Sequence, residues 1–570
     1  MDATMIGFLI LLLFVLCLAW TAWRESRGRR ARFLQNMIQA WGKIPDREYS
    51  WEELEKISQY FRQREKKGFY IDDITWNDLN MDQVFALLNQ CLSPVGDACL
   101  YDMLRKPVFD KETLEERNRL MDFFRENQAT RHKLQQLLIG IRKPGSSGFY
   151  EAVHVTREVT LQGSGVQLVM CLGFFLSLLF FAIKPDIGVF FLLGMSLFNI
   201  GSYFVKKQEV DVYITGFRCV IQLLSAQKEL EKLNIPQLEA YTAQAGEYAR
   251  ALSKFKRGNF LVVDRSSAGG GLEGFFLDYV RMLTHLDLIK FYDMLKAMQE
   301  NTEALDGLME IFGTLDALIS AASFRESLPY YTVPNLEEGE KAYIRVKNLY
   351  HPLLSDPVAN SIEAREGILI TGSNASGKST FLKNIALNAI LAQTIYTAVA
   401  TSYEAPYFKI MTSMALRDDL QGGESYFIVE IRSLKRILEE SEKEGCLLCI
   451  VDEVLRGTNT IERIGASSRI LAALQRENVL PFAATHDIEL SYILEKRYEN
   501  YHFEEEITQK EVVFNYLLKK GRVTTRNAIR LLEMTGYDRA LANQAKAAVA
   551  DFENTGIWKV MEKEKEKLSN

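Results

Sequence analysis

GILITGSNASGKST, residues 367–380, decides the fold of the C-terminal part of this chain. A short apolar run, 367–371, leads into Gly372-Ser-Asn-Ala-Ser-Gly377-Lys378-Ser379, which fits the pattern G-x-x-x-x-G-K-[ST]. A helix-like stretch begins at Thr380. Because a strand, a glycine-rich turn and a helix follow one another in this order, the sequence predicts a loop that wraps around nucleotide phosphates, a P-loop.

This loop predicts a site for ATP and Mg²⁺. Backbone N–H groups of a loop that curls at its glycines point at phosphates, and the following helix N-terminus favours anions. We expect Lys378 to reach the β- and γ-phosphates and Ser379 to bind Mg²⁺. The predicted nucleotide-binding residues of the loop are Gly372, Ser373, Asn374, Ala375, Ser376, Gly377, Lys378, Ser379 and Thr380.

A second acidic motif follows the apolar run 446–451, which ends in Asp452 and Glu453. ATP hydrolysis needs one carboxylate near Mg²⁺ and one that polarises the attacking water. We assign the first role to Asp452 and the catalytic role to Glu453. The pair Cys446 and Cys449 resembles half a zinc site, but no second Cys/His pair completes one, so we interpret it as part of a buried strand.

A third apolar run, 479–484, ends at Thr485-His486-Asp487. A histidine at the end of this strand is placed to contact the γ-phosphate and sense its presence, so we include His486 among the catalytic residues with Lys378 and Glu453. The alternative is that His486 is a structural histidine.

The pattern of apolar residues separates two fold classes. From about residue 341, short apolar runs alternate with helical patterns, which predicts an α/β domain with a largely parallel sheet. The stretches 33–160 and 206–330 instead carry apolar residues at three- and four-residue spacing, which predicts helices. A glycine-rich break at 266–271 predicts a loop between two helical groups.

Composition limits the classes of protein. The chain has 570 residues, enough for about four domains, and a formal net charge of -6. This charge argues against a protein that coats nucleic acids, but a local basic site stays open. Its 7 Cys residues are odd in number and sparse, which argues against a disulfide framework. The mean hydropathy of -0.08 hides strongly apolar segments.

Three uncharged segments, 5–23, 166–183 and 187–205, are predicted to span a membrane. The first is followed by a densely basic stretch and preceded by no Lys or Arg, so the positive-inside rule places the N-terminus outside. Lys206 and Lys207 follow the third segment. We expect a multi-pass protein of the cell membrane with its other parts in the cytoplasm. The alternative is that 166–205 forms two buried core helices.

The residues 341–555 resemble the ATPase domain of the MutS family, a branch of the ABC-type ATPases. The matching stretches are His351-Pro352, 371–380, Asp418-Asp419-Leu420, 423–430, 452–460 and Ala484-Thr-His486. In the family, Arg-Gly-Thr-x-Thr after Asp-Glu separates its members from transporter ATPases. Residues 71–125 and 311–335 resemble the helical core of the family.

The resemblance implies a homodimer formed through the ATPase parts, with each nucleotide held between two subunits. Ser425 matches the signature serine of the family and would contact the γ-phosphate bound on the partner subunit. Asn459 and Thr460 would lie at the same junction, and His351 would belong to the nucleotide site. Glu424 departs from the pattern, since repair proteins typically have a basic residue there.

DNA mismatch repair and the binding of mismatched or branched DNA also follow from the resemblance, but this chain departs from the family there. We expect the mismatch-reading domains to be absent, because a membrane span begins at residue 5. The membrane hairpin occupies the general place of the DNA clamp. A reduced clamp could remain in 206–275, whose notable basic cluster is Lys254-Phe-Lys256-Arg257. DNA is therefore a candidate partner only.

The predicted fold is an α/β ABC-type P-loop ATPase domain at the C-terminus, preceded by an all-α core and lever that transmembrane helices interrupt. The predicted parts are an anchor with its basic flank (1–32), a helical core (33–165), a membrane hairpin (166–205), a helical lever (206–335) and the ATPase domain (336–570). The predicted function is a membrane-anchored MutS-like ATPase. The alternatives are an ATP-driven membrane scaffold or a minimal transporter, although the spans lack the charged residues of a polar pathway.

Overall fold

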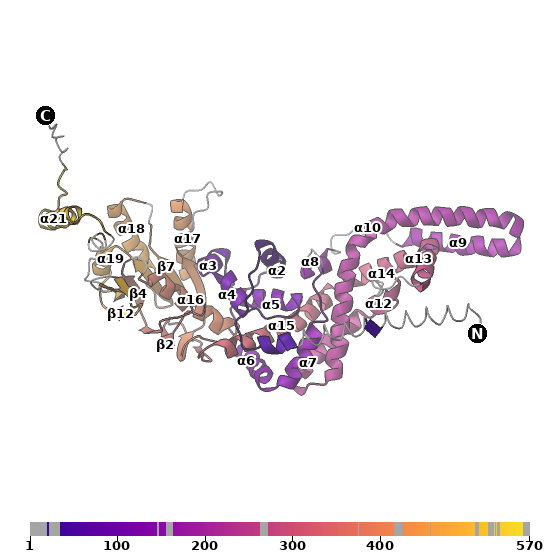
Figure 1. The fold of residues 1–570 in the computed structure, drawn as a ribbon, viewed down its shortest axis with the longest axis horizontal. Coiled ribbons are helices and arrows are strands. Elements are labelled where there is room, and N and C mark those ends of the chain that lie inside the picture. Colours follow the sequence, from indigo (N-terminus) through magenta and orange to yellow (C-terminus); the bar gives the residue numbers. More distant parts are fainter. Residues whose placement is uncertain are drawn as a thin grey trace, which may run out of the picture. The chain divides into compact units, whose positions relative to one another are not determined.

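The computed structural model describes residues 20–21, 35–144, 148–155, 164–262, 272–373, 376–414, 426–455, 458–507, 512–522, 529, 532 and 536–561. The chain forms two compact units (Figure 1). The helical unit contains 1–71, 80–329 and 393–397, and the α/β unit contains 72–79, 330–392 and 398–570. Apart from Trp20 and Thr21, the predicted span 5–23 lies outside the described residues, and so does the glycine-rich break at 266–271.

The described part of the helical unit consists of helices, as the spacing of apolar residues predicts. Local signals start several of them: Ser50 and Glu53 form a capping box, and Asp110 caps the next long helix through the N–H groups of Glu112 and Thr113. The helices are α2 (Trp51–Gln63), α4 (Met81–Leu88), α5 (Pro94–Arg105), α6 (Lys111–Glu126), α7 (Gln128–Leu138), α8 (Phe149–His154), α9 (Gly165–Ile183), α10 (Pro185–Leu233), η1 (Pro236–Leu238), α11 (Glu239–Ala251), α12 (Ser253–Lys256), η2 (Asn259–Leu261), α13 (Leu272–Thr284), α14 (Leu286–Glu300) and α15 (Thr302–Ser327).

The core of the helical unit forms around α15, which packs against α5. The buried carboxylate of Asp316 accepts hydrogen bonds from the backbone N–H groups of Leu92 and Ser93 and from the Ser93 hydroxyl. A Cβ atom at Gly96 would lie 2.2 Å from Asp316 Oδ2, so a glycine is needed for this close approach. Burial raises the pKa of Asp316 to about 7.

Helices α9 and α10 pack against each other as an antiparallel hairpin, with Lys184 alone between them. By length and apolar composition, three described helical stretches could cross a membrane: α9, the first part of α10 (185–210) and α15. Only α15 is buried along most of its length, inside the core of the helical unit. Beyond the predicted span, α10 continues without a break to Leu233.

The α/β unit is built on a six-stranded sheet with the strand order β12-β9-β4-β8-β7-β6. All neighbours are parallel except β12 and β9. The strands β4, β7 and β8 are buried along their whole length, which explains why they appear in the sequence as continuous apolar runs. The strands are β4 (Gly367–Thr371), β6 (Phe408–Ser413), β7 (Cys446–Asp452), β8 (Val479–Thr485), β9 (Tyr498–His502) and β12 (Lys519–Lys520).

A second, four-stranded sheet with the order β1-β5-β2-β3 is mixed, and a small antiparallel pair, β10 and β11, follows later in the chain. The sequence did not predict either one. The remaining elements of the unit are β1 (Asn335–Glu337), β2 (Ile344–Leu349), β3 (Asn360–Ala364), β5 (Ser402–Pro406), β10 (Glu505–Ile507), β11 (Val512–Phe514), α3 (Asp73–Asp78), α16 (Lys378–Thr394), α17 (Tyr426–Ser441), α18 (Thr460–Ala473), α19 (Ile488–Ile493) and α21 (Arg539–Thr555). A helical N-terminal part and a C-terminal α/β part, both predicted, are confirmed.

The short helix α3 belongs to the α/β unit although its sequence lies among the helices. Its Asp78 carboxylate accepts hydrogen bonds from the Thr412 hydroxyl (2.6 Å) and the Met414 N–H (3.0 Å), at the end of β6. Asp72 pairs with Arg436 of α17. The contact at Met414 adjoins the segment 415–425, which itself lies outside the described residues.

Candidate functional site

Three polar loops meet at one edge of the six-stranded sheet. Thr371 of β4 pairs with Thr485 of β8, and Asp452 of β7 pairs with Ala484 of β8. Because these strands are parallel and in register, their carboxyl ends lie together. The loop after β4, Glu453 after β7 and His486 after β8 therefore meet at this edge, the usual ligand-binding edge of open α/β sheets.

Glycines allow the loop after β4 to curl back over the end of its strand. Gly372 and Gly377 have φ angles of +150° and +106°, which other residues rarely adopt. A Cβ atom at Gly372 would lie 2.7 Å from the carbonyl oxygen of Phe503, so the space also requires glycine. Helix α16 then begins directly at Lys378. Asn374 and Ala375, both predicted to bind nucleotide, lie outside the described residues.

Lys378 lies buried inside the curl of the loop. Its Nζ donates hydrogen bonds to the carbonyl oxygens of Gly372 (2.8 Å) and Ser373 (2.7 Å). The Ser373 hydroxyl donates to Glu505 Oε2 at 2.8 Å, a carboxylate that the sequence analysis did not single out. The ammonium group thus stays within the loop, where a bound phosphate would meet it.

Glu453 and His486 form a direct contact between the ends of β7 and β8. Glu453 Oε1 pairs with His486 Nε2, and His486 Nδ1 donates to the Gly372 carbonyl oxygen at 3.0 Å. Glu453 has a left-handed backbone, φ +55°, and its N–H bonds the Ala484 carbonyl oxygen. Since the Gly372 carbonyl oxygen can only accept, a proton lies on Nδ1. The three strand ends are thereby connected.

Two buried oxygen atoms at this edge have no hydrogen-bond partner among the described residues: Asp452 Oδ1 and Ser376 Oγ. Buried polar atoms normally have partners, so unpaired ones point to a missing ligand. Ser379 is exposed toward the cavity in front of the loop. A hydroxyl and a carboxylate suit Mg²⁺, so Ser379 and Asp452 fit the metal predicted for them and would hold it there. Bound Mg²⁺ would neutralise phosphate charge.

A cavity of about 480 Å³ lies in front of the loop and the start of α16. The sequence predicted the loop side, including Thr380, but most of the opposite wall was missed. Asn360 Nδ2 donates to the Tyr516 carbonyl oxygen at 3.0 Å, which holds Tyr516 near Gly377. The missed lining residues are Leu354, Ser355, Asp356, Val358, Asn360, Phe381, Asn384, Phe503 and Tyr516. No local pattern marks them as one group, because they come from distant parts of the chain.

His351 also lines this cavity, as its assignment to the nucleotide site requires. The side chain is buried, and burial, helped by the Lys383 ammonium, lowers the pKa of His351 to about 4. Its Nδ1 accepts a hydrogen bond from the Leu353 N–H at 3.3 Å. The ring is therefore neutral at physiological pH and carries its proton on Nε2.

Of the residues predicted to act across a dimer, the structure describes Asn459 and Thr460 but not Ser425. Asn459 is exposed and caps α18, since its Oδ1 accepts from the Ile461 N–H at 2.9 Å, and Thr460 is the first residue of that helix. Arg463 of the same helix pairs with Asp487, next to His486. Ser425, Glu424 and the stretch Asp418-Asp419-Leu420 lie outside the described residues.

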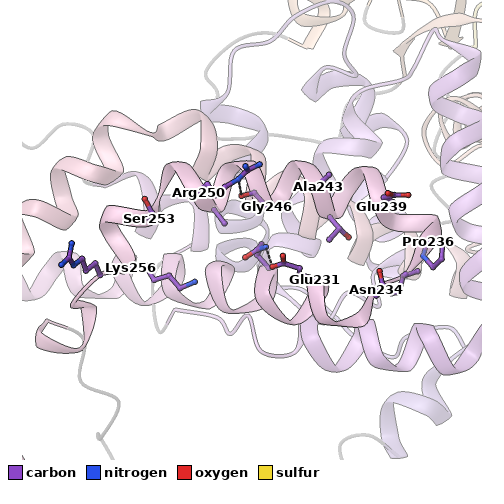
Figure 2. A pocket seen from close by; sticks show the side chains of 14 residues that line it. Glu231, Asn234, Pro236, Glu239, Ala243, Gly246, Arg250, Ser253 and Lys256 are labelled. Carbon is purple, nitrogen blue, oxygen red and sulfur yellow. Dashed lines mark hydrogen bonds between the residues drawn. The ribbon is translucent and has the colours of Figure 1, made fainter.

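The basic cluster of the helical unit borders a groove of about 970 Å³ between the end of α10 and the helices α11 and α12 (Figure 2). The groove closes at the turn near Asn234 and Pro236, beside the acidic Glu231 and Glu239. Arg250, Lys256 and Arg257 line its other end. Burial and the neighbouring Lys228 lower the pKa of Lys256, so cations are crowded here.

The C-terminal part of the chain is similar to known proteins of one family. Residues 368–553 match the family model described as MutS domain V. DNA mismatch repair protein MutS of Thermus thermophilus is 30% identical over 267 residues, which cover 46% of this chain and 32% of that protein. MutS protein homolog 4 of Homo sapiens is 29% identical over 286 residues, 47% of this chain and 30% of that protein. The match thus spans about a third of each relative.

The parallel sheet, the curled loop and the polar strand ends define an α/β domain whose sheet edge has the geometry that suits a phosphate-rich ligand. With the match to its model, the stretch 368–553 of this chain belongs to the MutS domain V family.

Proposed function

We propose that this protein is a membrane-anchored ATPase of the MutS type, with an ABC-type P-loop domain that binds ATP and Mg²⁺ at the edge of its six-stranded sheet. One observation carries the proposal: Glu453, His486 and Gly372 are joined by hydrogen bonds beside Lys378, at the ends of three parallel strands. Hydrolysis of a phosphoanhydride needs a phosphate cradle with its metal ion and a group that orients the attacking water, and this edge offers residues for each.

The residues divide the reaction as follows. The loop N–H groups and Lys378 hold the β- and γ-phosphates, while Ser379 and Asp452 are the metal ligands. Glu453 accepts a proton from the attacking water as the new oxygen–phosphorus bond forms and the bond to the bridging oxygen breaks. His486 holds Glu453 in position through the contact at Nε2 and also touches the loop, so it can respond to the γ-phosphate. His351 and Tyr516 provide walls for the rest of the nucleotide.

The family resemblance implies a homodimer in which two such domains face each other. In this arrangement Ser425 and Asn459 of one subunit complete the site of the other. The exposure of Asn459 and Thr460 at the start of α18 suits a surface that meets a partner.

Membrane anchoring is supported by the α9–α10 hairpin. Its large apolar side chains face outward, with Phe190 73% and Leu197 71% exposed. Such a surface is costly in water and favourable in lipid. Lys206 and Lys207 follow the apolar part, so this end lies in the cytoplasm together with the ATPase domain, and the segment 5–23 is a third span.

The test is Glu453→Gln in the detergent-solubilised full chain. ATP turnover should fall about 100-fold or more, while binding of a fluorescent ATP analogue stays and ATP-trapped dimers accumulate. The matched control is Glu477→Gln, which removes an exposed carboxylate of the same unit. Unchanged turnover in Glu453→Gln would rule out its catalytic role.

A second candidate function, DNA binding, is favoured by the basic end of the groove between α10 and α11–α12 (Figure 2). Contacts of this kind go to phosphates and are sensitive to salt. Gel-shift measurements with mismatched and branched duplexes at several salt concentrations, with and without ATP, test it. If no DNA binds even at low salt, the protein is an ATP-driven membrane scaffold, or a transporter if liposome flux is observed.

A further inference from the structure

The hairpin of α9 and α10 has its polar and apolar residues inverted relative to a soluble protein. Its buried side chains include Gln167 and Asn199, at 4% and 0% exposure, while the large apolar side chains face outward. Asn199 and Tyr203 stand one turn apart on α10, so they lie on one face of the helix. The element that packs on this polar face must therefore lie beside the apolar part of the hairpin.

The turn between α13 and α14 covers it. Asn199 Nδ2 donates to the Leu283 carbonyl oxygen at 2.6 Å, and His285 Nε2 donates to the Asn199 carbonyl oxygen at 2.9 Å. Tyr203 OH donates to Asp287 Oδ2 at 2.8 Å. His285 and Asp287 are themselves buried, at 0% and 2% exposure. The turn is thus docked on the hairpin through three hydrogen bonds.

The backbone carbonyls at the end of α13 have partners within the protein, whereas the buried atoms Asn199 Oδ1, His285 Nδ1 and Asp287 Oδ1 have no hydrogen-bond partner among the described residues. His285 has a left-handed backbone, φ +52°, and its N–H bonds the Arg281 carbonyl oxygen, which closes the helix. The Leu283 carbonyl, one of the last four of the helix, would normally need solvent and is instead satisfied by Asn199. The Thr284 hydroxyl bonds back to the Val280 carbonyl oxygen. Satisfying backbone groups within the protein is required where lipid replaces water.

The depth of the contact follows from helix geometry. Asn199 precedes Lys206 by seven residues, which is about 10 Å along a helix. If Lys206 and Lys207 mark the cytoplasmic boundary, as the proposed anchoring requires, then Leu283 and His285 lie inside the cytoplasmic leaflet. Tyr279, one turn before Leu283, is 61% exposed, and tyrosine is favoured at such an interface.

We propose that residues 272–288, the helix α13 with its turn into α14, form a membrane insert whose partner is the lipid of the cytoplasmic leaflet. This element enters the leaflet from the cytoplasmic side and returns, docked on α10 through Asn199, and it is not a fourth span. It joins the helical unit to the bilayer at a second place besides the hairpin. The inference rests on the proposed anchoring of the protein in a membrane.

The test uses the photoreactive amino acid p-benzoylphenylalanine in the full chain, reconstituted in vesicles of phosphatidylcholine and phosphatidylglycerol. It is placed at Tyr279, at Phe190 on the hairpin and at Trp51, which is 75% exposed on α2. Lipid adducts are measured by mass spectrometry after illumination. We expect adducts at Phe190 and Tyr279 and only background at Trp51.

The positions separate the two proposals. Adducts at Phe190 with background at Tyr279 would overturn the insert and leave the anchoring intact. Background at Phe190 would overturn the anchoring, and the insert with it. Adducts at all three positions would overturn the insert too, because contact with lipid would then not be specific to this element.

A second measurement tests the docking on α10. Asn199→Leu should lower the Tyr279 adduct about fivefold, the size expected for one lost interhelical hydrogen bond in a membrane, and leave the Phe190 adduct unchanged. Ser196→Leu is the matched control, because it removes a polar group of the same helix whose hydroxyl donates to the helix's own backbone, at the Leu192 carbonyl oxygen. An unchanged Tyr279 adduct in Asn199→Leu would overturn the docking.

Discussion

The six-stranded sheet of the α/β unit buries apolar strands and gathers polar side chains at one edge, whereas the α9–α10 hairpin buries polar side chains and exposes apolar ones. At the sheet edge, Glu453 and His486 follow two different strands and pair with each other, and Lys378 and His486 both donate to the carbonyl oxygen of Gly372. In the hairpin, Asn199 and Tyr203 come from one helix and bond a turn that lies more than eighty residues further along the chain.

The comparison shows that hydrogen bonds between buried polar groups serve different purposes in the two regions. At the sheet edge they hold charged groups ready for a ligand that comes from water. In the hairpin they remove polar groups from an apolar surface. Burial alone therefore does not identify a functional site in this protein, and the surroundings of the buried group decide its interpretation.

The largest effect is expected at the sheet edge. Lys378→Ala removes the ammonium group that meets the phosphates, so ATP turnover should fall about 1000-fold, and ATP binding should weaken, by the scale of a lost preorganised charge contact. Turnover and fluorescent nucleotide binding are measured on the solubilised full chain. Lys496→Ala, an exposed lysine of the same unit, serves as control. Equal turnover in both variants would contradict the assignment.

The next effect concerns a buried carboxylate of the helical core. Because the pKa of Asp316 is raised to about 7, the folded state keeps a proton that the unfolded state releases above about pH 4. Stability of the core should fall by about 3 kcal/mol as the pH rises from 4 to 7, and then level off. Hydrogen exchange of α5 and α15, corrected for intrinsic rates, measures this loss.

Asp316→Asn should remove most of that pH dependence, while Asp293→Asn, at an exposed position of α14, should keep it. A slope that persists in Asp316→Asn would assign the titration to another group. The nearest candidate is the neighbouring carboxylate of Asp97, whose pKa burial also raises.

The third effect tests the outward apolar surface. In a variant with Lys184→Cys at the tip of the hairpin, an impermeant maleimide should label intact cells from outside. Adding Leu197→Lys places a charge in the lipid region, which costs about 2–3 kcal/mol, and should lower the labelled fraction about tenfold or more. Leu197→Met is the control. Equal labelling in both would mean that this face of α10 does not meet lipid.

The smallest effect is expected at His351. The pKa of His351 is lowered to about 4, which means that the folded state favours the neutral ring. The contribution of this ring to the stability of the fold is therefore complete above pH 6.5 and is lost as the pH falls toward 4. ATP affinity should therefore change less than about twofold between pH 7 and pH 8 through this group. Titrating the affinity of wild type and His351→Gln checks it. A wild-type step near pH 7 that His351→Gln removes would contradict the neutral ring.

The sequence indicated much of the candidate site, because the loop at Gly372, the pair Asp452-Glu453 and His486 each follow an apolar strand and the pattern G-x-x-x-x-G-K-[ST] is local. The opposite wall of the cavity was missed. Asn360 and Tyr516 meet only after β3 and the segment following β11 have folded together, and no spacing in the sequence connects them. Glu505, the partner of Ser373, was missed for the same reason.

By itself, the sequence determined the alternation of strands and helices, the curl of the loop at Gly372 and Gly377, and the apolar length of α9 and of the start of α10. These features depend on neighbouring residues, so local sterics and burial are sufficient to specify them. Only the tertiary structure decided which groups satisfy Asn199 and Tyr203, and that the long apolar helix α15 lies inside a protein core. Composition cannot distinguish burial by lipid from burial by protein, because both remove apolar surface from water, and the packing of distant helices makes that choice.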